Sequence, residues 1–387
     1  MVTTEAWVLP AAAVAPDWDG TAGGALQRTV IEIGDPGPGE ALVEPLLGSW
    51  EANVDHALTR TPIDVCSARG EESVILGNLG VVRVLDSNPV PGGPSLAPGT
   101  VCMLMPFGRL DRHGYVELVH AYDCPGTMGL LARRSVLPLA NLLPLPESTP
   151  YSVEQWATYG RYFTAWDNWR AALGCWRTQL PDADPAEHLV LGWGGGVALA
   201  ELTLAARAGF RTAMTVGSDE RRELVEKLGI TALDRRNWPG LTVPSRGAAP
   251  DEVARHEAST AAFVATVREL SDGQGAAILI DNIGTPLWKL TSSVLARQGV
   301  ISTCGWKAGM RIPVLRGAEC LSRHLHVNTH VWRSHDVQVI RDVMETTEFL
   351  PPPQAIEVWD FDDVPSLAQD YNQDRVASYF ALYRVND

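Results

Sequence analysis

The sequence lacks the features that mark nucleic-acid-binding and membrane proteins. Its 387 residues carry a formal net charge of −15, and the lysines and arginines form no cluster interleaved with aromatic residues, which argues against a nucleic-acid partner. No stretch approaches the roughly 20 apolar residues that are needed to cross a bilayer. Met1–Glu5 begins no basic segment followed by an apolar core, so we expect no membrane partner and a cytoplasmic location.

Cysteine is sparse and scattered. The six cysteines are Cys66, Cys102, Cys124, Cys175, Cys304 and Cys320. None of them lies within four residues of another, so the spacing contains neither a C-x-x-C clip nor a zinc ribbon. We therefore expect buried free thiols in a reducing compartment.

A glycine-rich stretch has the order strand, turn, helix, strand. Leu189–Leu191 is apolar, Gly192–Gly196 is a glycine-dense turn, Val197–Arg207 has helical periodicity, and Thr212–Val216 is a second apolar run. Such glycines let the backbone approach a pyrophosphate that lies over the helix N-terminus. No register of the fingerprint G-x-G-x-x-G/A is perfect here, so a purely structural turn remains the alternative.

The two halves of the chain have different patterns. Residues 1 to about 150 show short strand candidates, such as Gln27–Ile33 and Glu40–Leu47, between Pro and Gly turns, which predicts a small barrel. From Val153 onward helices and strands alternate, which predicts a parallel doubly wound sheet. The tail returns to strand character. We therefore predict one domain from 1–152 and 332–387, interrupted by a second domain, 153–331.

Four stretches, taken in order, resemble the medium-chain dehydrogenase/reductase superfamily. They are similar to its P-G-E-V-L-V, L-G-H-E-x-x-G-x-V, D-x-V-G-G-x-x-F and L-x-x-G-G-x-x-V-x-x-G patterns, and lie at Pro38–Leu46, Leu76–Val84, Asp281–Leu287 and Leu295–Gly305. The resemblance covers nearly the whole chain. It implies an α/β protein in which a GroES-like β-barrel domain is interrupted by a Rossmann doubly wound parallel-sheet domain, with cofactor and substrate in the cleft between them.

The chain departs from this family at the zinc ligands. Zinc-dependent members hold the metal through a Cys after the second strand, the His and Glu of G-H-E, and a further Cys or Asp. Here Gly48–His56 contains no cysteine, and Asn78 and Leu79 replace the His and Glu. No cysteine lies between Cys102 and Cys124, so the four-cysteine structural lobe is missing as well. Too few ligands remain for a zinc site, and we expect a protein without metal.

Two short stretches resemble quinone reductases and the enoyl or crotonyl-CoA reductase branch. They are Leu191–Ala198, similar to the glycine turn of those enzymes, and Asn328–Trp332, similar to a G-S-H-F-A stretch near their substrate. The resemblance implies a small-molecule substrate, with a CoA or carrier-protein thioester as one candidate. It also implies a homodimer through edge strands of the Rossmann sheet, with Val300–Thr303 near such an edge.

The end of the second Rossmann strand favours NADPH. Gly217 stands where NAD enzymes carry an acid for the ribose 2′-hydroxyl, and Ser218, Arg221 and Arg222 suit a 2′-phosphate. A solvated helix face is the alternative for the arginines. The cofactor-binding residues implied in total are Thr164, Gly192, Gly194, Gly195, Gly196, Val197, Ser218, Arg221, Arg222, Asn282, Gly284, Cys304 and Gly305.

The expected chemistry follows from the missing zinc. Hydride addition to an isolated ketone would lack its electrophile, whereas an activated C=C needs a positioned hydride, a proton and hydrogen-bond donors to a carbonyl. The candidate catalytic residues are Tyr162, His330, His56 and Asn53. Packing or loop roles are the alternative for each.

We therefore hypothesise a zinc-independent, NADPH-dependent reductase of an enoyl thioester, enone or quinone. One alternative is an imine or aldehyde reductase of the same fold. The other is a non-catalytic dinucleotide-binding or scaffold protein, because Trp193 stands where similar enzymes carry a small residue and its indole could fill the pyrophosphate position.

Overall fold

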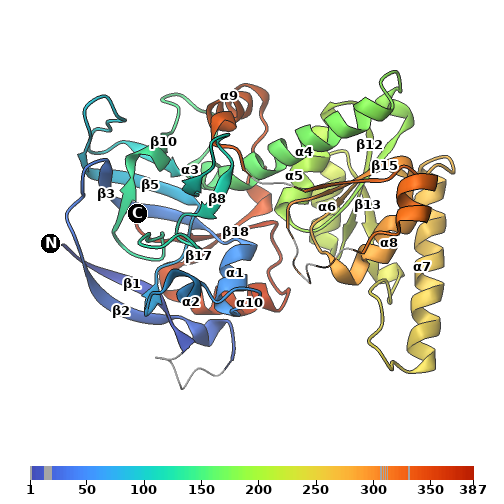
Figure 1. Ribbon diagram of the computed structural model, residues 1–387, viewed down its shortest axis with the longest axis horizontal. Coiled ribbons are helices and arrows are strands. Elements are labelled where there is room, and N and C mark those ends of the chain that lie inside the picture. The colour runs from blue at the N-terminus through green and yellow to red at the C-terminus, as the bar shows by residue number, and fades with distance from the viewer. Residues whose placement is uncertain are drawn as a thin grey trace. The chain divides into compact units, whose positions relative to one another are not determined.

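Two kinds of β-sheet organise the chain, one in each of two units. The computed structural model describes residues 2–12, 20–305, 307, 309, 311, 313–329 and 332–387. The first unit comprises Met1–Gly160 and Trp332–Asp387, and the second unit comprises Arg161–Val331. The chain therefore leaves the first unit, builds the whole second unit and returns (Figure 1).

The first unit is built from mostly antiparallel sheets. Its strands are β1 Val2–Pro10, β2 Gln27–Ile33, β3 Glu40–Ser49, β4 Ser73–Val74, β5 Gly80–Asn88, β6 Val101–Leu104, β7 Phe107–Leu110, β8 Val116–Val119, β9 Ser135–Pro138, β10 Leu142–Pro144, β17 Ile356–Asp360 and β18 Phe380–Arg384. Its helices are α1 Ala52–Leu58, α2 Val65–Arg69, α3 Val153–Ala157, α9 Val337–Thr347 and α10 Val364–Asn372, and short 3-10 turns lie at η2 Gly23–Ala25, η3 Leu139–Asn141, η8 Ser334–Asp336, η9 Pro353–Ala355 and η10 Phe361–Asp363.

The largest sheet of this unit joins the two ends of the chain. Its strand order is β10-β6-β5-β3-β18-β17, with β9 also pairing with β3, while β2-β1-β4 form a second sheet and β7-β8 a hairpin. β18 runs antiparallel to β3, and Tyr383 lies opposite Gly48. The strand-like tail of the sequence therefore completes the sheet that the first 150 residues begin.

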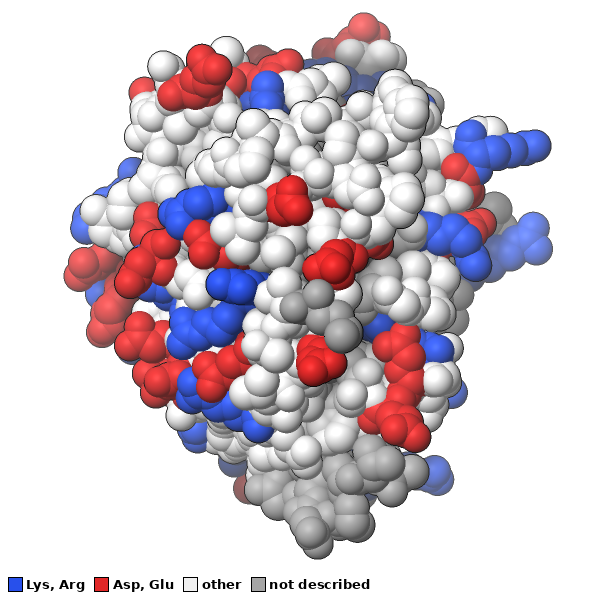
Figure 2. All heavy atoms as spheres, turned by 90° about the vertical axis from the view of Figure 1, so that its left-hand side faces the viewer, with Lys and Arg blue, Asp and Glu red and all other residues white. Residues whose placement is uncertain are grey.

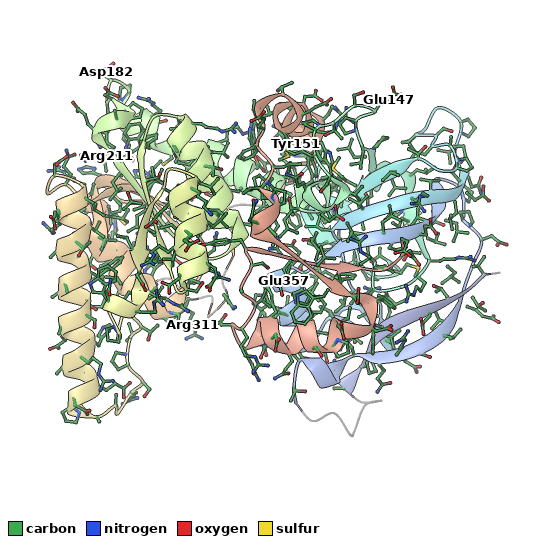
Figure 3. The ribbon with its side chains drawn as sticks, turned by 180° about the vertical axis from the view of Figure 1, so that it is seen from behind. Glu147, Tyr151, Asp182, Arg211, Arg311 and Glu357 are labelled. Carbon is green, nitrogen blue, oxygen red and sulfur yellow. The ribbon has the colours of Figure 1, made fainter. Side chains whose placement is uncertain are left out.

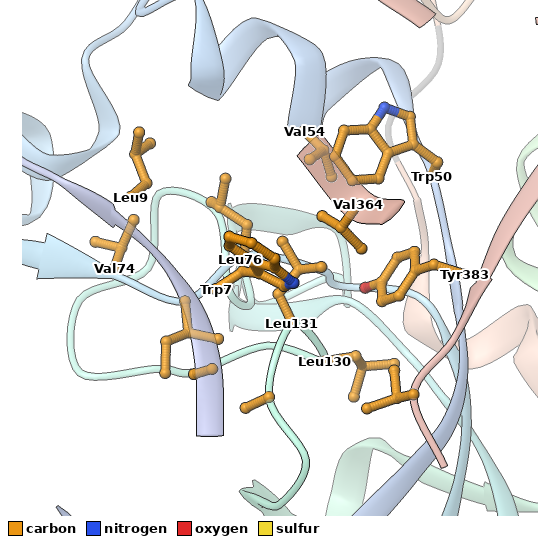
Figure 4. Packing of buried hydrophobic residues seen from close by; sticks show 14 of the residues in the cluster. Trp7, Leu9, Trp50, Val54, Val74, Leu76, Leu130, Leu131, Val364 and Tyr383 are labelled. Atoms are coloured by element: carbon orange, nitrogen blue, oxygen red, sulfur yellow. The ribbon is translucent and has the colours of Figure 1, made fainter. Parts of the chain in front are cut away.

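Tyr383 explains two glycines in the core of the first unit. A Cβ built on Gly48 would lie 1.9 Å from Cζ of Tyr383, and one built on Gly77 would lie 2.3 Å from its hydroxyl oxygen. The ring is fully buried among the hydrophobic residues shown in Figure 4, and it packs edge-on against Trp50 with ring centroids 6.1 Å apart. Any side chain at Gly48 would displace this ring.

Hydrogen bonds from side chains hold the loop at Thr127 and Met128, just after the region between Cys102 and Cys124 in which the sequence lacks the four-cysteine lobe. The buried Arg69 guanidinium donates to Glu71 at 2.8 Å and to the carbonyl of Thr127. His120 Nε2 lies 3.0 Å from the carbonyl of Met128, and burial lowers the pKa of His120 to about 4, so its imidazole is neutral at pH 7. The outer face of this unit carries interspersed acidic and basic side chains (Figure 2).

The second unit is a parallel sheet with helices around it. Its strands are β11 Leu189–Trp193, β12 Arg211–Val216, β13 Thr231–Asp234, β14 Ala276–Asp281, β15 Leu295–Thr303 and β16 His326–Thr329. Its helices are α4 Tyr159–Gln179, which begins in the first unit, α5 Gly196–Arg207, α6 Asp219–Lys227, α7 Pro250–Leu270 and α8 Trp288–Val294, with turns at η4 Pro185–Glu187, η5 Arg235–Asn237 and η6 Thr285–Leu287 and a π-helix, η7 Arg316–Ser322.

The strand order of this sheet, β13-β12-β11-β14-β15-β16, is that of a Rossmann fold. Every pairing in it is parallel. The order reverses between β11 and β14, so the carboxyl ends of these two strands form the topological switch point, where ligands of such sheets bind. The predicted α/β class, with an antiparallel-sheet part and a parallel Rossmann-like part, is confirmed.

Candidate functional site

The glycine turn has the geometry of a phosphate-binding loop. Gly194 has φ +135°, which side chains disfavour, and a Cβ there would lie 3.2 Å from Cβ of Asn282. Gly192 allows α5 to approach β11, because a Cβ on it would lie 3.0 Å from Leu202. Gly195 is the N-cap of α5, and a Cβ built on it would meet nothing within 4 Å. The turn is therefore closed towards the protein and open above the helix.

The N-terminus of α5 offers backbone donors at this open position. Among the described residues no side chain caps the helix, and the first helical amide with an intrahelical partner is that of Leu199, which donates to the carbonyl of Gly195. The backbone amides of Gly196 and Val197 lie in the first turn of the helix, where no intrahelical carbonyl is available to accept from them. Together with the helix dipole they form an anion site.

Trp193 lies on the other face of the sheet. Successive strand residues point to opposite faces, so Gly192 faces α5 while the indole of Trp193 faces α7. There the indole is 2% exposed and packs against Phe263 with centroids 5.8 Å apart. Trp238 adds an edge-on contact to the same phenyl ring at 5.1 Å. The indole is part of the hydrophobic core of the second unit.

Two polar residues hold the switch point: Asp281, the last residue of β14, and Asn282, which follows it. Asp281 is buried, and its carboxylate accepts from the amides of Ile283 and Gly284, both at 3.0 Å, and from the Thr291 hydroxyl at 2.7 Å. These bonds fix the turn in which Gly284 adopts φ +96°. Asp281 therefore holds the turn in place, and the hydrogen bonds that its carboxylate accepts come from groups of the protein itself.

Asn282 connects this turn to the end of β15. Its Oδ1 accepts from the amide of Cys304 at 3.2 Å and from the thiol of the same residue at 3.4 Å. A Cβ on Gly305 would lie 3.9 Å from Cβ of Asn282, and Gly194 lies on its other side. The Nδ2 of Asn282 is buried without an acceptor among the described residues. Four of the predicted cofactor residues thus meet at one point, with one donor unused.

The end of β12 brings together residues that the sequence predicts and one that it misses. Ser218 is the N-cap of α6 and accepts from the amide of Arg221 at 3.3 Å. Arg222 pairs with Asp219 at 3.2 Å. A Cβ on Gly217 would lie 2.7 Å from Nε of Arg235, so this guanidinium covers the position where NAD enzymes carry an acid. Arg235 follows β13, one strand further along the sheet.

A buried carboxyl group lies beneath the glycine turn. Glu201 of α5 is 0% exposed; it accepts from Nδ2 of Asn168 in α4 at 2.9 Å and from the Ser302 hydroxyl in β15 at 3.4 Å. Burial raises the pKa of Glu201 to about 8, and the two hydrogen bonds only partly oppose that shift. The group is therefore protonated at pH 7, and it connects α4 and α5, which carry predicted cofactor residues, to β15, which Cys304 and Gly305 follow.

The candidate catalytic residues come from different parts of the chain. Asn53 and His56 are half-buried on α1 of the first unit, and their spacing of three residues puts them on one helix face. Tyr162, 2% exposed, and the predicted cofactor residue Thr164, 8% exposed, lie on α4 of the second unit. His330 lies outside the described residues.

The described part of the chain contains no group of three or more His, Cys, Asp or Glu side chains that could hold a metal ion. No helix among these residues is long and apolar enough to span a membrane.

Solved structures share this fold along the whole chain. A crotonyl-CoA carboxylase/reductase, AntE, in complex with NADP is 19% identical, with 99% of this chain and 94% of that chain covered and a TM-score of 0.77. The 2-octenoyl-CoA carboxylase reductase CinF from Streptomyces sp., in complex with NADP and 2-octenoyl-CoA, is 17% identical, with 99% and 87% covered and a TM-score of 0.76.

Dehydrogenases have the same fold. The 2R,3R-butanediol dehydrogenase from Bacillus subtilis is 15% identical, with 100% of both chains covered and a TM-score of 0.71. No protein-family model matches the sequence, and no curated protein is similar to it. At these identities the likeness concerns the fold. The chain shares the fold of these reductases and dehydrogenases, which is the fold that the resemblance of its four ordered stretches implies.

Proposed function

We propose that the protein is an NADPH-dependent reductase that acts on an activated C=C bond, without zinc. The observation that carries this proposal is the switch point of the second unit, where an open glycine turn, an uncapped helix N-terminus and the unused Nδ2 of Asn282 converge. The fold is shared with reductases that are solved in complex with NADP.

The residues of the second unit fit a dinucleotide phosphate. The turn at Gly194–Gly196 would hold the pyrophosphate through backbone amides, since no described residue lies within 4 Å of a Cβ built on Gly195. Arg235 would hold the 2′-phosphate beside Gly217, where an acid would repel it. Ser218 and Arg221 are proposed to assist from the first turn of α6, whereas Arg222 is engaged by Asp219.

The charge distribution supports a substrate that carries phosphate groups. Between Asp281 and Glu319 the sequence contains no acidic residue, although the whole chain has a net charge of −15. Within that stretch four exposed cations have no ion pair among the described residues: Lys289, Arg297, Arg311 (labelled in Figure 3) and Arg316. A CoA or carrier-protein thioester would supply matching phosphates.

The cofactor and the protein would supply different parts of the reaction. When bound, NADPH supplies a hydride to the alkene carbon. The chain must hold the carbonyl oxygen on which negative charge develops and deliver a proton to the neighbouring carbon. The amide of Asn53 can only hold a carbonyl, while the imidazole of His56 and the hydroxyl of Tyr162 can also transfer a proton.

Turnover with defined substrates tests this proposal. Purified protein is mixed with NADPH or NADH and with crotonyl-CoA, a neutral enone, a quinone, an aldehyde or an imine, and reduced-cofactor absorbance is followed. We expect oxidation of NADPH with crotonyl-CoA that survives removal of zinc by chelation. Activity with only the aldehyde or imine would favour the alternative reductase, and NADPH binding without any turnover would favour a binding protein.

We also propose that two copies associate through β16. This strand is the edge of the parallel sheet, and no described strand pairs with its free side, whereas Val300–Thr303 in β15 lies one strand further in. Leu315 and Leu321, in the segment that precedes this strand in the sequence, are 68% and 64% exposed. Leu321→Glu is expected to give monomers in sedimentation analysis, and Val30→Glu, equally apolar and 68% exposed in the first unit, is the matched control.

A further inference from the structure

Asn78 is a buried amide that has no hydrogen-bond partner in the part of the chain that the structure describes. The residue is only 1% exposed, and neither Oδ1 nor Nδ2 of its side chain forms a hydrogen bond with a described residue. An amide can form up to four hydrogen bonds, and leaving them unmade inside a protein costs free energy that folding must offset. Buried polar groups are almost always paired, so this exception requires an explanation.

Asn78 lies at the end of the sheet where β3 ends and β5 begins. The amide of Ser49, at the end of β3, donates to the carbonyl of Leu79 at 2.9 Å, and β5 begins at Gly80 opposite Gly48. Because β3 and β5 are antiparallel, the end of β3 and the start of β5 lie at the same end of the sheet. α1 starts at Ala52, three residues after β3 ends, so Asn53 lies at this end too.

Asn53 adds a second unused polar atom at that end of the sheet. Its Oδ1 is buried and has no donor among the described residues. The other buried asparagine of this unit behaves differently: Asn141, 4% exposed, donates through Nδ2 to the carbonyl of Phe107 at 2.8 Å. Unpaired amides are thus a feature of this place and not of the unit as a whole.

We propose that Asn78 is a catalytic residue whose Nδ2 donates a hydrogen bond to the substrate carbonyl oxygen. The inference rests on the proposed reductase function. A neutral amide in a water-poor site is a suitable donor, because it stabilises the charge that develops on the oxygen and needs no proton of its own. Its contribution is independent of pH, which distinguishes it from His56 or Tyr162.

The test compares stability with turnover in one variant. Asn78→Leu keeps the size of the side chain and removes the unpaired polar atoms. We expect kcat with crotonyl-CoA to fall about 100- to 1,000-fold at every pH, with an unchanged Kd for NADPH. The Tm should rise by about 2–4 °C, since a buried unpaired amide is replaced by an apolar group. Asn141→Leu, which breaks a formed hydrogen bond, should lower Tm and leave kcat within twofold.

Each result supports or overturns the inference. Full turnover by Asn78→Leu would overturn it, and so would a lower Tm with unchanged kcat, which is the result expected of an amide that binds only a structural water. Binding of the unreactive butyryl-CoA, measured by calorimetry with NADP present, separates the two proposals. If the wild-type protein binds butyryl-CoA but turns nothing over, the reductase function fails, while a tenfold weaker Kd in Asn78→Leu still supports the contact.

Discussion

Replacing Glu201 by Gln should stabilise the protein in a pH-dependent way. The amide of Gln has the shape of the protonated carboxyl group: it can accept from Asn168 through Oε1 and donate to the Ser302 hydroxyl through Nε2, where the carboxyl now lies at 2.9 and 3.4 Å. The amide of Gln does not titrate, so its protonation state is the same in the folded and the unfolded protein. The substitution therefore removes one titration and leaves the packing of α4, α5 and β15 intact.

The size of the effect follows from the raised pKa. In the unfolded chain Glu201 titrates at its ordinary value of 4.5, and in the folded protein its pKa is about 8. Below pH 4.5 both states hold the proton and the carboxyl costs nothing. As the pH rises from 4.5 to 8, the unfolded state alone releases its proton, so wild-type stability falls; at pH 7 the accumulated cost is about 3 kcal/mol.

Urea unfolding at a series of pH values measures this difference. Glu201→Gln should match the wild type at pH 4.5, exceed its unfolding free energy by about 3 kcal/mol at pH 7, and gain nothing more above pH 8. Glu226→Gln, the same substitution at an exposed position on α6, is the control. An advantage for Glu201→Gln that is the same at pH 5 and pH 8 would refute the reasoning, because it would mean that the carboxyl is not protonated in the folded state.

Three further predictions concern the glycine turn, the 2′-phosphate and the core. Gly195→Leu should weaken NADPH binding at least tenfold in fluorescence titration without lowering Tm, because its side chain enters open space above α5. Arg235→Ala should raise the Kd for NADPH about 10- to 100-fold and leave that for NADH unchanged; equal losses for both would contradict a 2′-phosphate contact. Gly48→Ala should cost about 3 kcal/mol or more in thermal unfolding, since its Cβ overlaps Tyr383, whereas Gly34→Ala meets nothing within 4 Å and should be neutral.

Short stretches of sequence were sufficient to predict individual strands and helices. Gln27–Ile33 is a strand with the predicted bounds, and the strand, turn and helix at Leu189–Arg207 form β11 and α5. Helix α8 ends at Val294, because Leu295 already pairs with Ala276 of β14 in the parallel sheet. β13, only four residues long, carries too short an apolar run to be recognised.

The site was harder to predict, because its members are neighbours only across the sheet. Arg235 reaches Gly217 from the next strand, and a count of residues along α6 cannot find it. Trp193 suggested a blocked pyrophosphate position, yet its indole points away from α5, since it follows Gly192 by one residue in a strand. The unpaired atoms of Asn78 became visible only once its surroundings were known.

The pairing of β18 with β3 has a consequence for the order in which the protein forms during synthesis. Leu47 pairs with Arg384, which follows it far along the chain, so the main sheet of the first unit cannot be completed until β18 has been synthesised. The second unit is continuous from Arg161 to Val331, and its strands are all synthesised earlier. During synthesis the parallel sheet can therefore form first, while the edge of β3 that pairs with β18 is still exposed.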